Sequence, residues 1–338
     1  MMIRKFNHVL VTGGAGYCGS VLVPQMLEMG YQVTVYDIQY YGCDFLPLEH
    51  PNLNIVKGDI RDISHLASCL NDVDAFIHLA CISNDASFEL DEKLSTSVNL
   101  DAFEPMVIAA KQSGVRRFIY ASTSSVYGIS EEPEVKENHP LVPLTLYNKF
   151  KGMCEPLLFK HTDKKFVGVI YRPATVCGYG PRQRLDVSVN ILTNLAVNKG
   201  KITVFGGSQL RPNLHIQDYA ELCKTLLEVS DEIIADQVFN CGYQNMSIMQ
   251  IAETVKKVVL EEFPEKDKIT VEVSPSNDLR SYHINSDKIT NVIGFKPQLS
   301  VEEAIRDLCR AFREGKLPDS LENDIYFNVR KMKKIRAA

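Results

Sequence analysis

A tyrosine and a lysine four residues apart, Tyr147 and Lys151, could together carry out acid–base chemistry near neutral pH. On a helix, residues at this spacing share a face. A free phenol has a pKa of about 10, and a nearby ammonium favours its deprotonated form, so the phenol can take up and return a proton. The upstream hydroxyl run Ser122-Thr123-Ser124-Ser125 could hold a substrate hydroxyl. Roughly one such Tyr-x-x-x-Lys pair is expected by chance in this chain, so the pair needs a supporting context.

A glycine loop near the N-terminus supplies that context. The segment Thr12–Gly19 reads Thr-Gly-Gly-Ala-Gly-Tyr-Cys-Gly and joins the apolar run His8–Thr12 to a helical pattern over Tyr17–Met29. Glycines let the backbone approach a pyrophosphate, and a helix N-terminus offers N–H donors. Asp37 ends the next apolar run, where a carboxylate binds both ribose hydroxyls and repels a 2′-phosphate. The pattern predicts NAD as the cofactor; the alternative is a glycine turn with a capping Asp.

Short apolar runs alternate with helical patterns through the first half of the chain. The runs lie at His8–Thr12, Gln32–Asp37, Leu53–Lys57, Ala75–Ala80, Arg117–Ser122 and Phe166–Tyr171, and the helical patterns between them include Ile63–Leu70 and Leu94–Ser113. This alternation predicts a parallel sheet with helices on both faces. Pro24, Pro105 and Pro156 fall inside helical patterns, and each should kink or shorten its helix.

The second half of the chain is less regular. It has helical patterns at Val187–Asn198, Ile216–Val229, Met246–Val259 and Val301–Arg313, and strand-like runs at Ile202–Phe205, Gln237–Asn240 and Ile269–Val273. We therefore predict an α/β fold, a Rossmann-type doubly wound parallel sheet with a smaller C-terminal α/β substrate lobe. The expected NAD-binding domain covers residues 1–172, with return segments near 216–242. The expected substrate lobe covers residues 173–215 and 243–338.

Composition and charge argue against several classes of function. A net charge of −5 gives no basic field for nucleic acid, and no apolar run approaches the ~18–20 residues of a membrane span. The basic run from Arg330 to Arg336 is expected to be a solvated, frayed tail. Nine scattered cysteines and eight histidines without short spacings predict reduced thiols and no metal site. A removable signal peptide would destroy the glycine loop, so we expect a cytoplasmic protein.

Six ordered motifs resemble those of the extended short-chain dehydrogenase/reductase family, which includes nucleotide-sugar epimerases and dehydratases. They are the glycine motif Thr12–Gly19, the adenine-side motif Gly58–Asp62, the fourth-strand motif His78-Leu79-Ala80, the helix residue Asn99, the hydroxyl motif Ser122–Gly128 and the Tyr147/Lys151 pair. Together they cover nearly the whole chain and are far more specific than any one alone. By the family pattern the catalytic hydroxyl is Thr123, with its neighbour Ser124 ranked second.

The resemblance implies NAD-dependent oxidation of a sugar hydroxyl, typically at C4. Tyr147 would deprotonate that hydroxyl, Thr123 would hydrogen-bond the same oxygen, and Lys151 would hold the nicotinamide ribose and lower the pKa of Tyr147. An epimerase then returns the hydride to the other face of the keto sugar, so NAD is regenerated and stays bound. The candidate cofactor contacts are Gly13, Gly16, Tyr17, Cys18, Gly19, Asp37, Asp59, Ile60, Leu79, Ala80, Asn99, Tyr147, Lys151 and Pro173.

Two of the residues near the cofactor have an alternative interpretation. Asp59 would reach the adenine edge with Ile60 packed on it, although this segment could instead cap the following helix, a role that suits Asp62 better. His78 lies inside the fourth apolar run, and we expect it to be packed in the core and not catalytic.

Departures from the family pattern narrow the reaction. The 4,6-dehydratases usually carry Asp-Glu directly after the catalytic hydroxyl, where this chain has Ser124-Ser125, so elimination lacks its acid–base pair. Thr175-Val176-Cys177-Gly178 replaces the usual Asn-Val-Tyr-Gly, which alters the sugar-side contacts. Arginine forks suit a diphosphate, and surface or structural ion pairing is the alternative for each. The candidate substrate contacts are Ser83, Ser124, Thr175, Asn190, Arg211 and Arg280.

The leading interpretation is an NAD-dependent nucleotide-sugar epimerase acting at C4, in the synthesis of bacterial surface-polysaccharide sugars. The second is a net C4 dehydrogenase or 4-keto reductase of a nucleotide-diphosphate sugar, for example a GDP-heptose. A 4,6-dehydratase or a non-enzymatic NAD(H)-sensing protein ranks lower. The resemblance also implies a homodimer, in which the helices near Leu94–Ser113 and around Tyr147 form a four-helix bundle.

Overall fold

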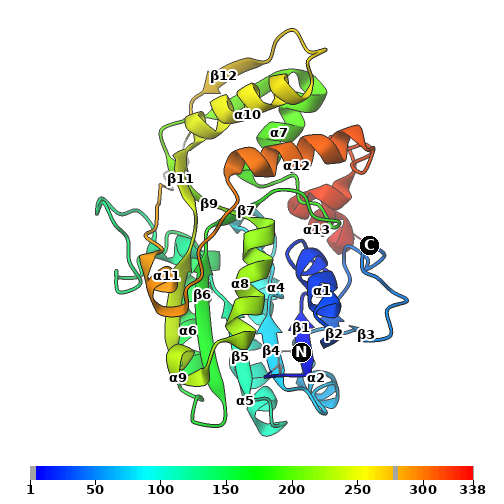
Figure 1. Ribbon diagram of the computed structural model, residues 1–338, viewed down its shortest axis with the longest axis vertical. Coiled ribbons are helices and arrows are strands. Elements are labelled where there is room, and N and C mark those ends of the chain that lie inside the picture. Colours follow the sequence, from blue (N-terminus) through cyan, green and yellow to red (C-terminus); the bar gives the residue numbers. More distant parts are fainter. Residues whose placement is uncertain (1–4, 277–280, 338) are drawn as a thin grey trace.

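Six strands from the first half of the chain and one later strand, β10, form a seven-stranded parallel sheet, as the alternation of apolar runs and helical patterns predicted (Figure 1). The computed structural model describes residues 5–276 and 281–337. The strand order is β10-β6-β5-β4-β1-β2-β3. Strands β1 to β3 are added in one direction across the sheet, and β4 to β6 in the other. The order of the strands therefore reverses between β1 and β4, and the carboxyl ends of the strands at such a point form a ligand-binding crevice. The strands are β1 (His8–Thr12), β2 (Gln32–Asp37), β3 (Leu53–Lys57), β4 (Ala75–His78), β5 (Arg117–Ala121), β6 (Val167–Pro173) and β10 (Gln237–Cys241).

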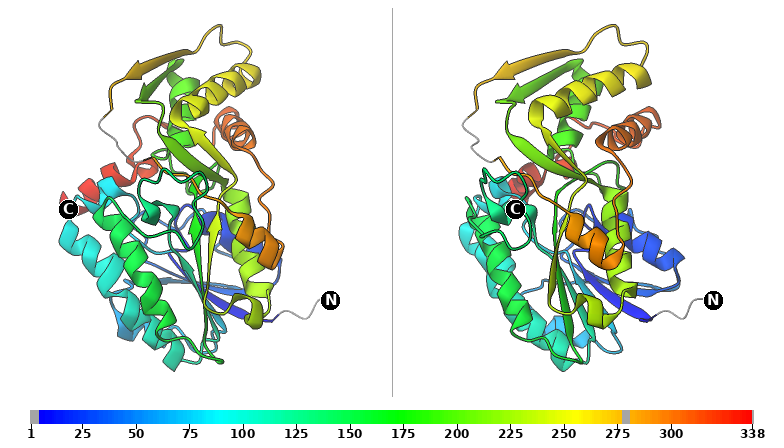
Figure 2. Two further views of the ribbon diagram at one scale, coloured as in Figure 1. Left: turned by 90° about the vertical axis from the view of Figure 1, so that its left-hand side faces the viewer. Right: turned by 60° about the vertical axis from the view of Figure 1, so that its left-hand side comes forward.

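Helices cover both faces of this sheet (Figure 2). Side chains alternate along a strand, and in β1 the residues Val9 and Val11 join one hydrophobic cluster while Leu10 joins another. The first cluster includes α1 (Gly19–Glu28) and α8 (Ile216–Glu228), and the second includes α2 (Ile63–Ser68), α5 (Phe103–Gln112) and α6 (Leu146–Phe159). Burial on both faces explains why these strands read as continuous apolar runs.

The smaller C-terminal lobe lies above the carboxyl end of the sheet (Figure 1). It contains a three-stranded sheet, β11-β9-β7, and a parallel pair, β12-β8. Between these elements the chain returns to the large sheet, where β10 pairs with β6 in parallel. The lobe's elements are β7 (Thr175–Cys177), α7 (Ser188–Lys199), β8 (Lys201–Phe205), β9 (Leu210–His215), β11 (Gln244–Ser247), α10 (Ile248–Glu262), β12 (Thr270–Ser274) and α12 (Val301–Arg313).

Several helix boundaries differ from the sequence prediction. The single helix expected over Leu94–Ser113 is divided into α4 (Glu92–Thr96), a π-helical turn (Ser97–Asp101) and α5. Pro105 lies in the first turn of α5, where an N–H has no helical partner in any case. Pro24 and Pro156 do not end α1 and α6, which continue through them. Packing of these two helices on the sheet offsets the hydrogen bond that each proline removes.

The prediction of a frayed C-terminal tail is wrong. The chain ends in a helix, α13 (Asn328–Ala337), which follows a short turn (Asp324–Tyr326). Met332 is buried among the basic residues of this helix, and Phe327, just before the helix, is buried too, whereas Lys333 is exposed. The apolar residues are too few to give a clear helical period, so the run of positive charge hid an amphipathic helix.

A buried ion pair joins α6 to the central strands. Arg172 of β6 and Glu155 of α6 are each 4% exposed. They form a two-pronged pair, with N–O distances of 2.9 Å from Nε and 2.6 Å from Nη2. The hydroxyl of Ser122 donates to Glu155 at 2.6 Å, and Arg172 donates to the hydroxyl of Tyr127 at 2.6 Å. These bonds fix the helix that carries the Tyr-x-x-x-Lys pair against the end of β5.

Glu155→Ala should lower the free energy of unfolding by about 3–5 kcal/mol, because it leaves the Arg172 guanidinium buried without its counter-charge. Urea denaturation followed by circular dichroism measures the loss. Glu272→Ala is the matched control, since its pair with Lys201 is on the surface with side chains 56% and 48% exposed, and it should cost less than about 1 kcal/mol. Equal losses in the two variants would contradict the role given to the buried pair.

Candidate active site

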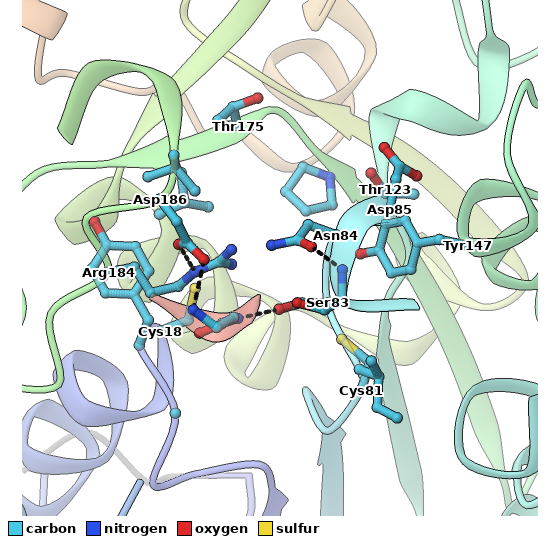
Figure 3. A pocket seen from close by; sticks show the side chains of 18 of the residues that line it. Cys18, Cys81, Ser83, Asn84, Asp85, Thr123, Tyr147, Thr175, Arg184 and Asp186 are labelled. Atoms are coloured by element: carbon cyan, nitrogen blue, oxygen red, sulfur yellow. Dashed lines mark hydrogen bonds and ion pairs between the residues drawn. The ribbon is translucent and has the colours of Figure 1, made fainter. Parts of the chain in front are cut away.

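A cavity of about 700 Å³ lies at the carboxyl ends of the central strands, beneath the C-terminal lobe. It is lined by the glycine loop, the ends of β2 and β4, the hydroxyl run after β5, the start of α6 and residues of the smaller lobe. Segments that are distant in the sequence therefore meet around one space (Figure 3). This is the ligand-binding position of a doubly wound sheet.

The glycine loop forms a cradle that only glycine fits. Gly13 has a φ of +72°, and a Cβ there would lie 2.6 Å from the backbone nitrogen of Ala80. A Cβ on Gly19 would collide with the backbone of Gly14. The loop therefore brings bare backbone and the N-terminus of α1 to the cavity, where Gly16, Tyr17 and Cys18 also line the wall. Backbone N–H groups at a helix N-terminus suit the pyrophosphate of a dinucleotide.

Asp37 lies at the other end of this wall, at the end of β2. Its carboxylate accepts hydrogen bonds from the backbone nitrogens of Gln39 at 2.7 Å and Ala15 at 3.0 Å. Burial raises the pKa of Asp37, and these two bonds oppose that rise. A carboxylate has about four acceptor sites, so Asp37 can still bind the ribose hydroxyls of NAD.

The adenine-side residues Asp59 and Ile60 also line the cavity. Arg61 binds the carboxylate of Asp59 through Nε, 3.0 Å from each oxygen, and lowers its pKa. Asp62 caps α2 by accepting from the backbone nitrogen of His65 at 3.0 Å, which is the role that the sequence favoured for it. Asp59 therefore does not cap α2 and remains a candidate contact to the adenine of NAD.

The fourth strand contributes Leu79 and Ala80 to the cavity wall, and Pro173 at the end of β6 lines it as well. Asn99 lies behind this wall, where it exchanges two 2.9 Å hydrogen bonds with the backbone of Ile82. It supports the loop after β4 from outside the cavity. His78 is packed, as expected: it is 4% exposed and stacks on Tyr120, with ring centroids 5.7 Å apart.

The three candidate catalytic residues line the same cavity, and Figure 3 shows two of them, Thr123 and Tyr147. Lys151 is buried, and its ammonium donates to the carbonyl of Ala121 at 2.7 Å. The hydroxyl of Thr123 lies 2.9 Å from that of Ser125, which in turn donates to the Asn148 side chain of α6. A chain of hydrogen bonds thus links the hydroxyl run to the helix that carries Tyr147.

The surroundings of Tyr147 change its acidity in the direction opposite to the one expected from Lys151. Burial raises the pKa of Tyr147 well above its ordinary value, and Cys81 and Asp85 raise it further, while Arg184 lowers it. Burial therefore favours the neutral form of the phenol. When bound, the oxidised nicotinamide would place a positive charge in the cavity, which favours the phenolate.

The candidate substrate contacts occupy different places. Ser83, Ser124, Thr175 and Arg211 line the cavity. Asn190 does not: it is fully buried behind the wall, accepts from the backbone of Gly178 at 3.0 Å and donates to the carbonyl of Arg184 at 2.8 Å. These bonds hold the loop between β7 and α7. They also occupy the hydrogen-bonding groups of the Asn190 amide within the protein itself. Arg280 lies outside the described residues.

Sequence reasoning did not assign a second group of residues that the structure brings to the cavity. They are Arg182, Arg184 and Asp186 from the loop after β7, and Asn328 and Met332 from α13. The charged Arg-Gln-Arg-Leu-Asp run directly after a Gly-Pro turn was a usable signal for the loop, since such loops lie at the carboxyl end of the sheet. Nothing local distinguishes Asn328.

Some classes of site are absent from residues 5–276 and 281–337. Within them, no group of three or more His, Cys, Asp or Glu side chains could hold a metal ion. No helix in the same ranges is long and apolar enough to cross a membrane. All nine cysteines are free thiols.

Comparison with known proteins identifies the family. A model of the NAD dependent epimerase/dehydratase family matches residues 9–242. The chain is 31% identical to the dTDP-D-glucose 4,6-dehydratase of Mus musculus over 326 residues, which cover 91% of this chain and 89% of that protein. It is 28% identical to the UDP-glucose 4-epimerase of Streptococcus mutans over 320 residues, 88% and 94% of the two chains. The low-salt glycan biosynthesis protein Agl12 of Haloferax volcanii is 29% identical over 88% of this chain and 96% of its own length.

Solved structures agree with these relatives. The UDP-glucose 4-epimerase of Thermotoga maritima, solved with UDP-glucose, superposes with a TM-score of 0.80 at 25% identity over 91% of this chain and 99% of its own. The dTDP-glucose 4,6-dehydratase DesIV of Streptomyces venezuelae, solved with NAD and TYD bound, has the same TM-score and identity over 91% and 98%. The chain therefore belongs to the NAD-dependent epimerase/dehydratase family. It is an enzyme family with NAD as its cofactor, and both the fold and the cofactor predicted from the sequence are confirmed.

Asp37→Asn should weaken NAD binding by about 10-fold or more and narrow the preference for NAD over NADP. The change removes a charge that accepts ribose hydroxyls and repels a 2′-phosphate. Dissociation constants of both dinucleotides, measured by calorimetry, give the ratio. Asp44→Asn, at an exposed aspartate of the following loop, is the control and should leave the ratio unchanged. An unaltered ratio in Asp37→Asn would remove Asp37 from the ribose site.

Proposed function

We propose that this protein is an NAD-dependent nucleotide-sugar epimerase that oxidises its substrate at C4 and returns the hydride to the opposite face. The observation that carries the proposal is that Thr123, Tyr147 and Lys151 line the same cavity as the glycine loop. Relatives that act on nucleotide sugars support the substrate class, since they include an epimerase and a dehydratase at comparable identity.

Each residue has a distinct part in the proposed reaction. Tyr147 takes the proton of the C4 hydroxyl as the C4–H bond breaks, and returns a proton when the hydroxyl is re-formed. Thr123 hydrogen-bonds the same oxygen and keeps it within reach of the phenol. Lys151 binds the nicotinamide ribose and adds positive charge beside the phenol. NAD, which the glycine loop and Asp37 would hold, would supply the acceptor and donor for the C4 hydride when bound.

The residues after Thr123 argue against elimination of water. Ser124 and Ser125 are buried hydroxyls where a dehydratase would need an acid and a base. Among the described residues, the carboxylates that line the cavity are those of Asp37, Asp59, Asp85 and Asp186. Asp186 pairs with Arg184 at 2.9 Å, and Thr145 donates a hydrogen bond to Asp85. Asp37 and Asp59 lie on the adenosine side, so no carboxylate pair remains next to Thr123.

We also propose that the enzyme is a homodimer and that its product enters surface-polysaccharide synthesis. The α6 residues Leu146 and Met153 are 38% and 43% exposed, and apolar side chains on a helix surface suit a bundle formed with a second copy. A glycan biosynthesis protein among the relatives supports the pathway.

A screen of UDP-, GDP-, dTDP- and CDP-sugars, read by NMR beside the absorbance of NADH, tests the proposed reaction. We expect a C4 epimer of one substrate without accumulation of NADH. Tyr147→Phe should lower turnover by about 10²–10⁴-fold, because the general base is lost, while NAD binding is kept. Steady accumulation of NADH would instead support the net C4 dehydrogenase, and full activity of Tyr147→Phe would exclude Tyr147 as the base.

The rate of C4 oxidation should rise with pH, because burial raises the pKa of Tyr147 and only the phenolate can accept the proton. Lys151→Met removes a positive charge beside the phenol, so the rising limb should move to higher pH. Profiles of kcat/KM against pH at saturating NAD measure both effects. The wild-type profile is the reference for Lys151→Met. A wild-type profile that is flat from pH 6 to 9 would contradict proton transfer to Tyr147.

A further inference from the structure

Two arginines of the loop after β7 have buried N–H groups without a partner. Arg182 is 3% exposed and its Nε makes no hydrogen bond, and the same holds for one terminal nitrogen of Arg184. Both side chains line the cavity. Burial lowers the pKa of Arg182 to about 10. Because an unsatisfied buried donor is costly, above all on a charged group, these N–H groups are suited to an anionic ligand in the cavity.

The arginines face the N-terminus of α1. Figure 3 places Arg184 beside Cys18, the residue that precedes this ten-residue helix. Burial raises the pKa of Cys18 to about 12, and the charges of Arg184 and Arg182 oppose the rise, which reflects their proximity. A helix N-terminus and two guanidinium groups converging on one space match a phosphate group. In this cavity, that space adjoins the glycine cradle.

Asn328 of the last helix holds this arrangement together. Its side-chain oxygen accepts from Arg182 at 2.7 Å, and its backbone nitrogen donates to Asp186 at 2.8 Å. Asp186 in turn pairs with Arg184. On the opposite side, the Asn328 amide donates to the hydroxyl of Ser83, in the loop after β4, at 2.9 Å. One side chain, itself 5% exposed, therefore bridges two walls of the cavity.

We propose that α13 is a clasp over the bound dinucleotide, in which Asn328 is a positioning residue that aims Arg182 and Arg184 at the NAD pyrophosphate. By closing the bridge to Ser83, Asn328 also slows the departure of NAD. Retention of the cofactor between the two hydride transfers is what an epimerase needs. The inference rests on NAD binding and not on the proposed epimerisation, so either can fail alone.

The rate of NAD dissociation tests the clasp. Purified holoenzyme is loaded with isotopically labelled NAD and chased with unlabelled NAD. Asn328→Ala should raise the dissociation rate by about 10-fold, because it releases both Arg182 and Ser83. Lys333→Ala, at an exposed position of the same helix, is the matched control and should leave the rate unchanged. An unchanged rate in a folded Asn328→Ala protein would overturn the proposal.

A second measurement separates phosphate positioning from a general loss of structure. ADP and adenosine are compared by their displacement of labelled NAD. Asn328→Ala should weaken ADP about 10-fold and leave adenosine nearly unchanged, because adenosine has no phosphate for the arginines to hold. Equal weakening of both would show a merely structural role and overturn the proposal. If Asn328→Ala fails to fold, Ser83→Ala opens the same bridge from its other end and should still speed NAD dissociation; no change would again reject the clasp.

Discussion

The position of the candidate active site depends on the way in which the end of β5 is tied to α6. Ala121 is the last residue of this strand and Ser122 follows it, and the two contact successive turns of the helix. The carbonyl of Ala121 accepts from Lys151, and the hydroxyl of Ser122 donates to Glu155, which is locked by Arg172. A buried ion pair adds little net stability compared with an apolar contact of the same size. Its value here is geometric, because it permits one register of the helix against the strand.

That register determines the electrostatics of the candidate base. The same packing that brings Tyr147 to the cavity also removes its phenol from water, and burial raises its pKa. The ammonium of Lys151 donates to the Ala121 carbonyl, and the net effect of the surroundings remains a raised pKa of Tyr147. Arg184 lowers the pKa of Tyr147, and an oxidised nicotinamide, when bound, would add its positive charge to that of Lys151. In the proposed reaction, proton abstraction by Tyr147 would therefore depend on the presence of the cofactor.

Much of the fold was readable from the sequence because its signals are local. Gln32–Asp37 and Leu53–Lys57 form strands with the bounds that their apolar runs indicate, and the helix Val301–Arg313 also has its predicted bounds. The glycine cradle was recognisable because its requirement, backbone without a Cβ, falls on residues within one short segment, Gly13 to Gly19.

The parts that could not be predicted are those that depend on tertiary contact. Asn328 is 146 residues from Arg182 and 245 from Ser83, and no pattern near it indicates a site. Asn190 has the right chemistry for a substrate contact, but its amide is used up by the β7–α7 loop. The basic residues of α13 suggested a solvated tail, because charge dominated a helix with only a few buried apolar side chains.

The proposed epimerisation places two opposed requirements on the cavity. The dinucleotide must stay, whereas the keto sugar must turn over between the two hydride transfers. The glycine cradle and the charged loop that Asn328 holds would anchor the cofactor. Freedom of the sugar is favoured by Thr175, which offers a single short hydroxyl where the family's usual Asn offers a longer amide. We propose that Arg211, which lines the cavity, is 8% exposed and has its guanidinium 5.3 Å from the ring of Tyr282, holds the diphosphate of the substrate. Anchoring a substrate by its diphosphate leaves the sugar free to present either face.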